Sequence, residues 1–168
     1  MDENLARALN EQVKHELASA YFYLSVCGYF ESTNLRGCAH WMRVQAQEEV
    51  GHAMKFFDFL NDRGERVRLQ AIDKPAEAFE SPLDAFMQVL ENERSVTSLI
   101  NSLYEQAVSA GDYSTQVLLQ WFVQEQVEEE RNASDVLERL RLAEDNPTAL
   151  LLIDRELAGR QPEPADGG

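Results

Sequence analysis

The sequence predicts an all-α protein: a four-helix bundle with one long crossover between the second and third helices and a short fifth helix at the C-terminus. The 168 residues are close to the length of one domain, for which roughly 150 residues is typical. Eight glycines and five prolines are few, and they fall in clusters that leave long segments uninterrupted. Apolar residues recur at spacings of three and four along these segments, as in helices with one buried face.

The first two predicted helices form a hairpin that covers residues 4–31 and 35–63. A polar turn at 32–34 separates them, and Gly64 ends the second helix. Residues 64–80 contain Pro75 and show no clear helical period. Because a connection of this length can travel the full height of a bundle, we expect it to be the crossover.

Capping signals mark the starts of the remaining helices. A serine, aspartate or asparagine that can cap a helix precedes each of them, and two of these caps are followed by proline at the first helical position. The signals are Ser81-Pro82, Gly111-Asp112 and Asn146-Pro147, and the helices are expected over residues 82–109, 113–143 and 148–158. Residues 1–159 are therefore expected to form one domain, and the Pro/Gly-rich residues 160–168 a mobile tail.

The charge balance favours cations as partners. Fifteen Lys and Arg residues against 30 Asp and Glu residues give a formal net charge of -15, which argues against nucleic acid or an anionic membrane as the main partner.

Cys27 and Cys38 lack CxxC spacing and are expected to be reduced thiols in the core. The N-terminus has neither a basic start nor an apolar stretch, so we expect a soluble, cytoplasmic protein.

Polar residues interrupt the apolar stripe of every long predicted helix, in each case near its midpoint. Antiparallel packing brings such residues to about the same level inside a bundle. Buried carboxylates repel one another and are costly to desolvate without a counter-charge, so the set predicts a site for metal cations. We call this set the polar layer; it comprises Glu16 in the first helix, Glu49 and His52 in the second, Glu93 in the third, and Gln126 and Glu129 in the fourth.

The residue types of the polar layer indicate which metals suit it. Glu49 and His52 form an E-x-x-H pair, whose spacing lets both side chains bind one ion from the same helix face. Oxygen-rich ligands with one imidazole suit iron or manganese better than metals that prefer thiolates. Many two-metal bundles carry a second E-x-x-H motif, but here Gln126-Val-Glu-Glu129 takes its place. The second metal position therefore lacks an imidazole and is expected to hold its ion less tightly.

From residue 10 to about residue 157 the chain resembles the non-haem bacterial ferritins, so the predicted bundle is ferritin-like. The resemblance lies in Glu93, in the fifth helix and in the segments LNEQVKHE (9–16), AQEEVGH (46–52) and LQWFVQEQVEEE (119–130). It implies iron storage and detoxification by a ferroxidase, which oxidises Fe(II) with O2 or hydrogen peroxide at a diiron centre within each subunit. It also implies a ferric oxyhydroxide mineral inside a hollow homo-oligomeric shell of about 24 subunits.

The same resemblance assigns roles to individual residues. It implies one iron at Glu16, Glu49 and His52 and the other at Glu93 and Glu129, with Glu49 bridging and Gln126 beside the second iron; a third iron maps to Glu48, Glu125, Glu128 and Glu129. The six polar-layer residues are thereby implied to be catalytic. Tyr23 matches a tyrosine that hydrogen-bonds a ligand or supplies an electron and is implied to act with them, and Trp121 lies next to the site. Haem is not expected, because Val50 stands where bacterioferritins carry a haem-binding methionine.

Two other functions remain open on the sequence. One is a diiron oxidoreductase that uses O2 or peroxide on another substrate without storing mineral; symmetric E-x-x-H motifs would favour it, and they are absent. The other is a metal-free helical interaction protein, in which leucine could replace the buried carboxylates with a gain in stability.

The remaining histidines, His15 and His40, are expected to be structural. The apolar residues of the fifth helix, Leu150, Leu151 and Ile153, are expected either to cover the end of the bundle or to line a channel at a symmetry axis.

Overall fold

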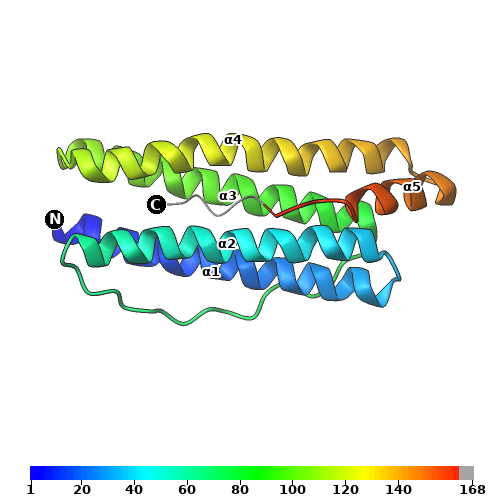
Figure 1. Cartoon of the computed structure of the whole chain (residues 1–168), viewed down its shortest axis with the longest axis horizontal. Helices are drawn as coiled ribbons and strands as arrows, with labels where there is room; N and C mark the ends of the chain where they lie inside the picture. The colour runs from blue at the N-terminus through cyan, green and yellow to red at the C-terminus, as the bar shows by residue number, and fades with distance from the viewer. Residues whose placement is uncertain (163–168) are drawn as a thin grey trace.

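The computed structural model describes residues 1–162 as a bundle of long helices (Figure 1). Over these residues it contains five helices and no strand: α1 (Glu3–Ser32), α2 (Arg36–Asp62), α3 (Pro82–Ser109), α4 (Tyr113–Leu142) and α5 (Pro147–Leu157). The predicted fold class is confirmed, and each helix end lies within one residue of its predicted position. Residues 163–168 of the predicted mobile tail lie outside the described residues.

Side chains at the predicted capping positions hold the helix starts. The Ser81 hydroxyl accepts a hydrogen bond from the backbone N–H of Asp84 at 3.0 Å, and the Asp112 carboxylate accepts one from Thr115 at 3.1 Å. Gly111 has a φ of 63°, in the left-handed region that glycine adopts without strain. The chain can therefore turn sharply from α3 into α4, and the two helices pack as an antiparallel hairpin.

The helices pack as two antiparallel pairs, α1 with α2 and α3 with α4 (Figure 1). Residues 64–80 leave the end of α2 and run along the outside of the α1–α2 pair to the opposite end of the bundle, where α3 begins. This segment is the predicted crossover. α5 lies at that same end, beyond the last turn of α4, and contacts α2.

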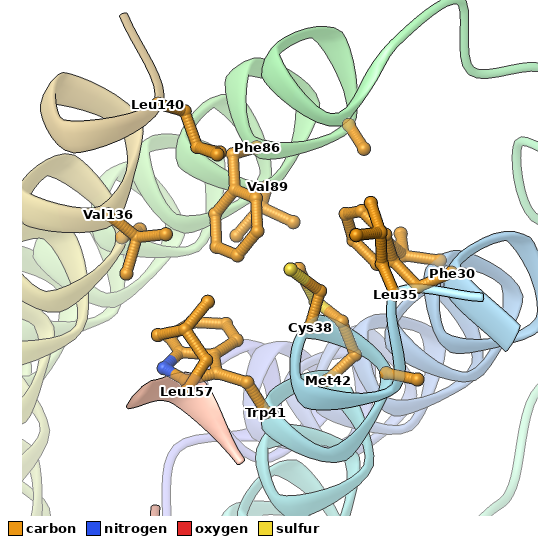
Figure 2. Packing of buried hydrophobic residues seen from close by; sticks show 14 of the residues in the cluster. Phe30, Leu35, Cys38, Trp41, Met42, Phe86, Val89, Val136, Leu140 and Leu157 are labelled. Carbon is orange, nitrogen blue, oxygen red and sulfur yellow. The ribbon is translucent and has the colours of Figure 1, made fainter. Parts of the chain in front are cut away.

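Two apolar clusters fill the bundle on either side of the polar layer. The cluster nearer α5 includes Phe86, whose ring centroid lies 5.9 Å from that of Phe30 and 5.4 Å from that of Trp41 (Figure 2). The cluster nearer the N-terminus includes Phe56 and Phe122, whose rings stack with centroids 4.1 Å apart. Because protein cores are close-packed, both clusters hold the helices that carry the polar layer in a fixed arrangement.

A close backbone approach holds α5 against the start of α2. A Cβ atom at Gly37 would lie 1.6 Å from the backbone oxygen of Asp154, and the Asp154 carboxylate accepts a hydrogen bond from the backbone N–H of Cys38 at 2.8 Å. Cys38 and Cys27 are buried free thiols, as predicted. Of the apolar residues expected at the bundle end, Ile153 is buried, Leu150 packs partly against the core, and Leu151 is exposed.

Replacing Gly37 by alanine is expected to detach α5 from α2, because the new methyl group overlaps the Asp154 backbone, which cannot rotate aside as a side chain can. Detachment exposes Ile153 and Leu157, so we expect the melting temperature to fall by about 10 °C. Arg36→Ala, at the exposed neighbouring position, is the control and should leave the melting temperature almost unchanged. Thermal unfolding followed by circular dichroism measures both; equal values would contradict the close approach.

Candidate metal centre

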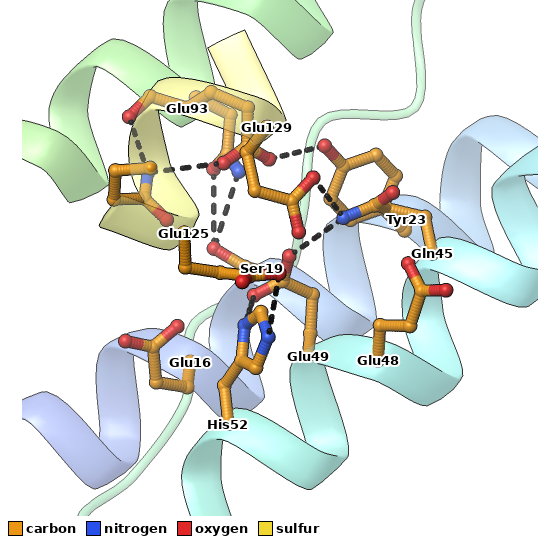
Figure 3. Close-up of polar contacts among 12 residues, drawn as sticks. Glu16, Ser19, Tyr23, Gln45, Glu48, Glu49, His52, Glu93, Glu125 and Glu129 are labelled. Atoms are coloured by element: carbon orange, nitrogen blue, oxygen red, sulfur yellow. Dashed lines mark hydrogen bonds and ion pairs between the residues drawn. The ribbon is translucent and has the colours of Figure 1, made fainter. Parts of the chain in front are cut away.

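The polar layer lies in the middle of the bundle, where all four long helices contribute side chains (Figure 3). Its relative exposures are 1% for Glu16, Glu49 and Glu93, 3% for Gln126, 4% for Glu129 and 5% for His52. The structure therefore buries all six residues for which the sequence predicted a shared interior position. Figure 3 shows the side chains from α3 and α4 facing those from α1 and α2.

Ligand atoms in the polar layer converge in two overlapping groups, within each of which all atoms lie within 4.8 Å of one another. One group is Glu16, Glu49 and His52, and the other is Glu49, Glu93 and Glu129. Because Glu49 belongs to both groups, its carboxylate can bridge two ions held side by side. This is the pairing of residues that the sequence resemblance implied.

The carboxylates of the polar layer lie close together and away from water, so their negative charges are poorly solvated. Burial and the charge of Glu49 raise the pKa of Glu93 to about 8, and burial with neighbouring carboxylates raises the pKa values of Glu16 and Glu129 well above their usual range. Burial lowers the pKa of His52, but its hydrogen bond to Glu49 and the nearby negative charges outweigh this effect and raise the pKa to about 10. Protons therefore neutralise the layer, and divalent cations can take their place.

Two buried glutamines orient these carboxylates. Gln45 Nε2 donates hydrogen bonds to Glu49 at 3.0 Å and, across the bundle, to Glu129 at 2.8 Å. Gln12 Nε2 donates one to Glu16 at 2.8 Å. Glu16 Oε2 is buried without a hydrogen-bond partner among the residues that the structure describes, as suits an oxygen facing a cation site, whereas the Gln45 amide turns its nitrogen toward the carboxylates. Gln12 and Gln45 lie on the buried faces of their helices, and the sequence pattern assigned neither of them a role.

Gln126 faces the second ligand group through its amide nitrogen. Nε2 lies 3.2 Å from the backbone oxygen of Glu93, which can only accept a hydrogen bond, and 3.3 Å from a carboxylate oxygen of the same residue. Nε2 also lies 3.1 Å from the Thr97 hydroxyl, which donates to Glu130 at 2.7 Å. Gln126 therefore lies beside the second group, as expected, and orients Glu93 by donating to it.

Both aromatic residues expected near the centre contact its ligands. The Tyr23 hydroxyl donates a hydrogen bond to Glu93 (Figure 3). Burial and the charge of Glu93 raise the pKa of Tyr23 well above its usual range, so the hydroxyl keeps its proton. The Trp121 ring meets the His52 ring edge-on with centroids 5.5 Å apart, and the Lys55 amine lies 4.2 Å from the Trp121 ring centroid.

The residues expected to hold a third iron are brought together only in part. Glu125 joins His52 and Glu129 in a group whose ligand atoms all lie within 4.8 Å. Glu48, which precedes the shared ligand on α2, pairs with Arg160, whose Nη2 lies 2.6 Å from a Glu48 carboxylate oxygen. The described residues therefore supply a third ligand group, but Glu48 is not a member of it.

Three further residues named from the sequence lie apart from the polar layer. Glu128 is exposed on α4 and lies 3.8 Å from Arg131 in an ion pair. The His40 ring nitrogen Nε2 lies 2.8 Å from the backbone oxygen of Arg160. His15 is partly buried on α1, and burial lowers its pKa. None of the three belongs to a ligand group within residues 1–162.

Residues 6–143 match the sequence profile of the ferritin-like domain. The chain belongs to the ferritin family. A bacterial non-heme ferritin of Bacteroides fragilis is 38% identical over 160 residues, which cover 95% of this chain and 99% of that protein. An open-pore ferritin from the hyperthermophilic archaeon Archaeoglobus fulgidus is 49% identical with a TM-score of 0.95, over 96% of this chain and 99% of its own. A humanized archaeal ferritin is 50% identical with a TM-score of 0.96, over 98% and 99%.

Membership of the ferritin family agrees with the side chains inside the bundle that can bind metal. The ferritin fold and the carboxylate and histidine groups that can hold metal together support iron storage as the general function. No helix within the described part of this ferritin, residues 1–162, is long and apolar enough to cross a membrane.

Proposed function

We propose that this ferritin is a ferroxidase that stores and detoxifies iron, depositing ferric oxyhydroxide inside a hollow homo-oligomeric shell of about 24 subunits. The observation that carries the proposal is that two buried ligand groups share Glu49. Iron is both substrate and cargo in this reaction. A shared carboxylate keeps two ions adjacent, so that their electrons can leave the centre as a pair.

We assign one iron position to Glu16, Glu49 and His52, and the other to Glu49, Glu93 and Glu129. When bound, the two Fe(II) ions supply one electron each to O2 or hydrogen peroxide. The carboxylates balance the extra positive charge of Fe(III). Because burial raises the pKa values of Glu93 and Glu129, cations bind at these carboxyls in exchange for protons.

The two positions differ in a way that suits iron passing through the centre. The first includes the imidazole of His52, whereas the second has carboxylates alone, and Gln126 donates a hydrogen bond to Glu93 there. A more weakly held second ion favours onward movement of Fe(III). A third position on this route is proposed at Glu125 and Glu129, which lie together beside His52, and it is completed by Glu48 only when Glu48 is released from Arg160. Glu128 is exposed beside Arg131 and lies outside this position. The proposal includes no haem, because the side chain of Val50 has no ligand atom.

Exposed apolar side chains support the assembly. Tyr21 and Leu24 on α1 are each about half exposed, and Leu151 and Leu152 on α5 are more exposed still. Apolar surface of this kind commonly marks contacts with partners, and identical copies are the commonest partners. The net charge of -15 would attract Fe(II) to the shell.

The two free cysteines suit a reducing compartment, so we place the protein in the cytoplasm.

Replacing Tyr23 by phenylalanine is expected to slow Fe(II) oxidation about 10- to 100-fold, because Glu93 loses the donor that orients it. Tyr29→Phe, on the same helix, is the control and should oxidise iron at the wild-type rate. Stopped-flow absorbance gives the rates, and calorimetry with Zn2+ gives the affinity. Weaker Zn2+ binding indicates a positioning role; slower oxidation with unchanged Zn2+ affinity indicates electron donation by Tyr23; an unchanged rate contradicts both.

The proposed function is tested by loading the protein with iron. Metal-free protein receives a large excess of Fe(II) in air, and iron and protein are followed together through size-exclusion chromatography. We expect iron far in excess of the centre's capacity to elute with a large protein shell. About two irons per chain and no more would instead favour the diiron oxidoreductase, and no retained iron would contradict both functions.

A further inference from the structure

The chain after α5 returns along α2, and Arg160 attaches it there. Arg160 makes three contacts with one helix. The His40 ring nitrogen Nε2 lies 2.8 Å from its backbone oxygen, its guanidinium carbon lies 4.3 Å from the Trp41 ring centroid, and its Nη2 lies 2.6 Å from a Glu48 carboxylate oxygen. These contacts span two turns of α2 and end at the residue beside the shared ligand Glu49.

The Arg160 side chain is enclosed to an unusual degree for an arginine so close to the chain end. It is only 16% exposed, and Glu48 is 12% exposed. Its second terminal nitrogen, Nη1, is buried without a hydrogen-bond partner among the described residues. A buried guanidinium depends on a carboxylate partner, so its position here depends on the charge of Glu48 and on the Trp41 ring.

The Arg160 contact bears directly on where Glu48 lies. Within residues 1–162 Glu48 is outside all three groups of converging ligand atoms, although it adjoins Glu49, which belongs to two of them (Figure 3). A guanidinium at 2.6 Å already supplies the positive charge that a metal ion would bring to this carboxylate. The docking of α5 on α2 at Gly37 fixes the chain that delivers the guanidinium.

We propose that Arg160 is a positioning residue that holds Glu48 away from the metal centre, so that the third cation position stays closed while the segment after α5 lies on α2. This inference rests on the cation positions of the proposed function. Arg160 acts as a tethered cation that competes with a metal ion for one carboxylate. The number of ions that each chain binds is then set by a residue 112 positions away in sequence from Glu48.

The test counts bound cations with Zn2+, which binds oxygen and imidazole ligands without changing its oxidation state. Metal-free wild type, Arg160→Gln and Arg155→Gln are titrated by equilibrium dialysis at one pH. Arg155→Gln removes the same charge from an exposed position on α5 and is the matched control. We expect Arg160→Gln to bind one more Zn2+ per chain than the other two proteins. Adding Glu48→Gln to that variant should remove the extra ion.

Anomalous diffraction from Zn2+-soaked crystals of Arg160→Gln should place the extra ion at Glu48. An unchanged count, a gain shared with Arg155→Gln, or an extra ion that survives Glu48→Gln would each overturn the role of Arg160. Failure of the cation positions assigned under the proposed function is distinguishable from these outcomes, because the wild type itself would then bind no Zn2+ at the two groups that share Glu49, whereas failure of iron storage alone appears only in the iron-loading experiment.

Discussion

Glu49→Ala is expected to abolish the rapid phase of Fe(II) oxidation, slowing it by more than about 100-fold, because loss of a ligand exceeds the usual effect of losing its supporting hydrogen bonds. Glu49 is the residue that both buried ligand groups share, so its removal weakens both iron positions at once. The variant is expected to fold, since it removes a buried negative charge from a layer where the pKa values of neighbouring carboxyls are raised by repulsion.

The measurement is stopped-flow absorbance after mixing metal-free protein with Fe(II) in air, with circular dichroism to verify the helices. His52→Ala is expected to give a similar loss, because it removes the imidazole of the first group. Glu91→Ala, an exposed glutamate two residues before Glu93, should oxidise iron at the wild-type rate. Wild-type rates in Glu49→Ala and His52→Ala together would show that the polar layer is not the oxidation site.

The fold and the polar layer could be predicted because two independent signals agree in this sequence. Helix starts carry side-chain caps such as Ser81 and Asp112, which satisfy backbone donors locally and so fix the boundaries. Between them the helical period assigns each residue to a face. A charged residue at an apolar position, such as Glu93, then stands out before any packing is known.

The parts that could not be predicted depend on contacts between distant segments. Gln45 is visible as a buried polar residue, but its hydrogen bond to Glu129 crosses from α2 to α4 and depends on how those helices pack. Arg160 belongs to a segment whose composition predicts a mobile tail, and only the docking of α5 carries it to Glu48. For Glu128 the resemblance implied iron binding, but the helical period gives a different answer. Glu128 lies one residue before the buried position of Glu129, so it is exposed beside Arg131.

Cation binding is expected to stabilise the protein more strongly as the pH rises. Folding raises the pKa of Glu93 from 4.5 to about 8 and that of His52 from 6.5 to about 10. Glu93 between pH 4.5 and about 8, and His52 between pH 6.5 and about 10, therefore hold protons in the folded metal-free protein that they lack in the unfolded chain. As the pH rises through these two ranges, both groups lower the free energy of unfolding. Divalent cations that replace the protons remove this penalty, so their affinity increases over the same range.

The melting temperature of the metal-free and Zn2+-loaded proteins, measured from pH 5.5 to 8.5, should thus diverge. Two sites occupied at 100 times their dissociation constants contribute about 5 kcal/mol, or about 10–20 °C for a chain of this size. Glu49→Ala is the control, because Zn2+ bound elsewhere on this acidic surface would stabilise it as much as the wild type. A gap that is independent of pH, or equally large in Glu49→Ala, would show that cations do not take the place of protons in the polar layer. A gap that widens with pH in the wild type alone is expected, because only there do two ligand groups share one carboxylate.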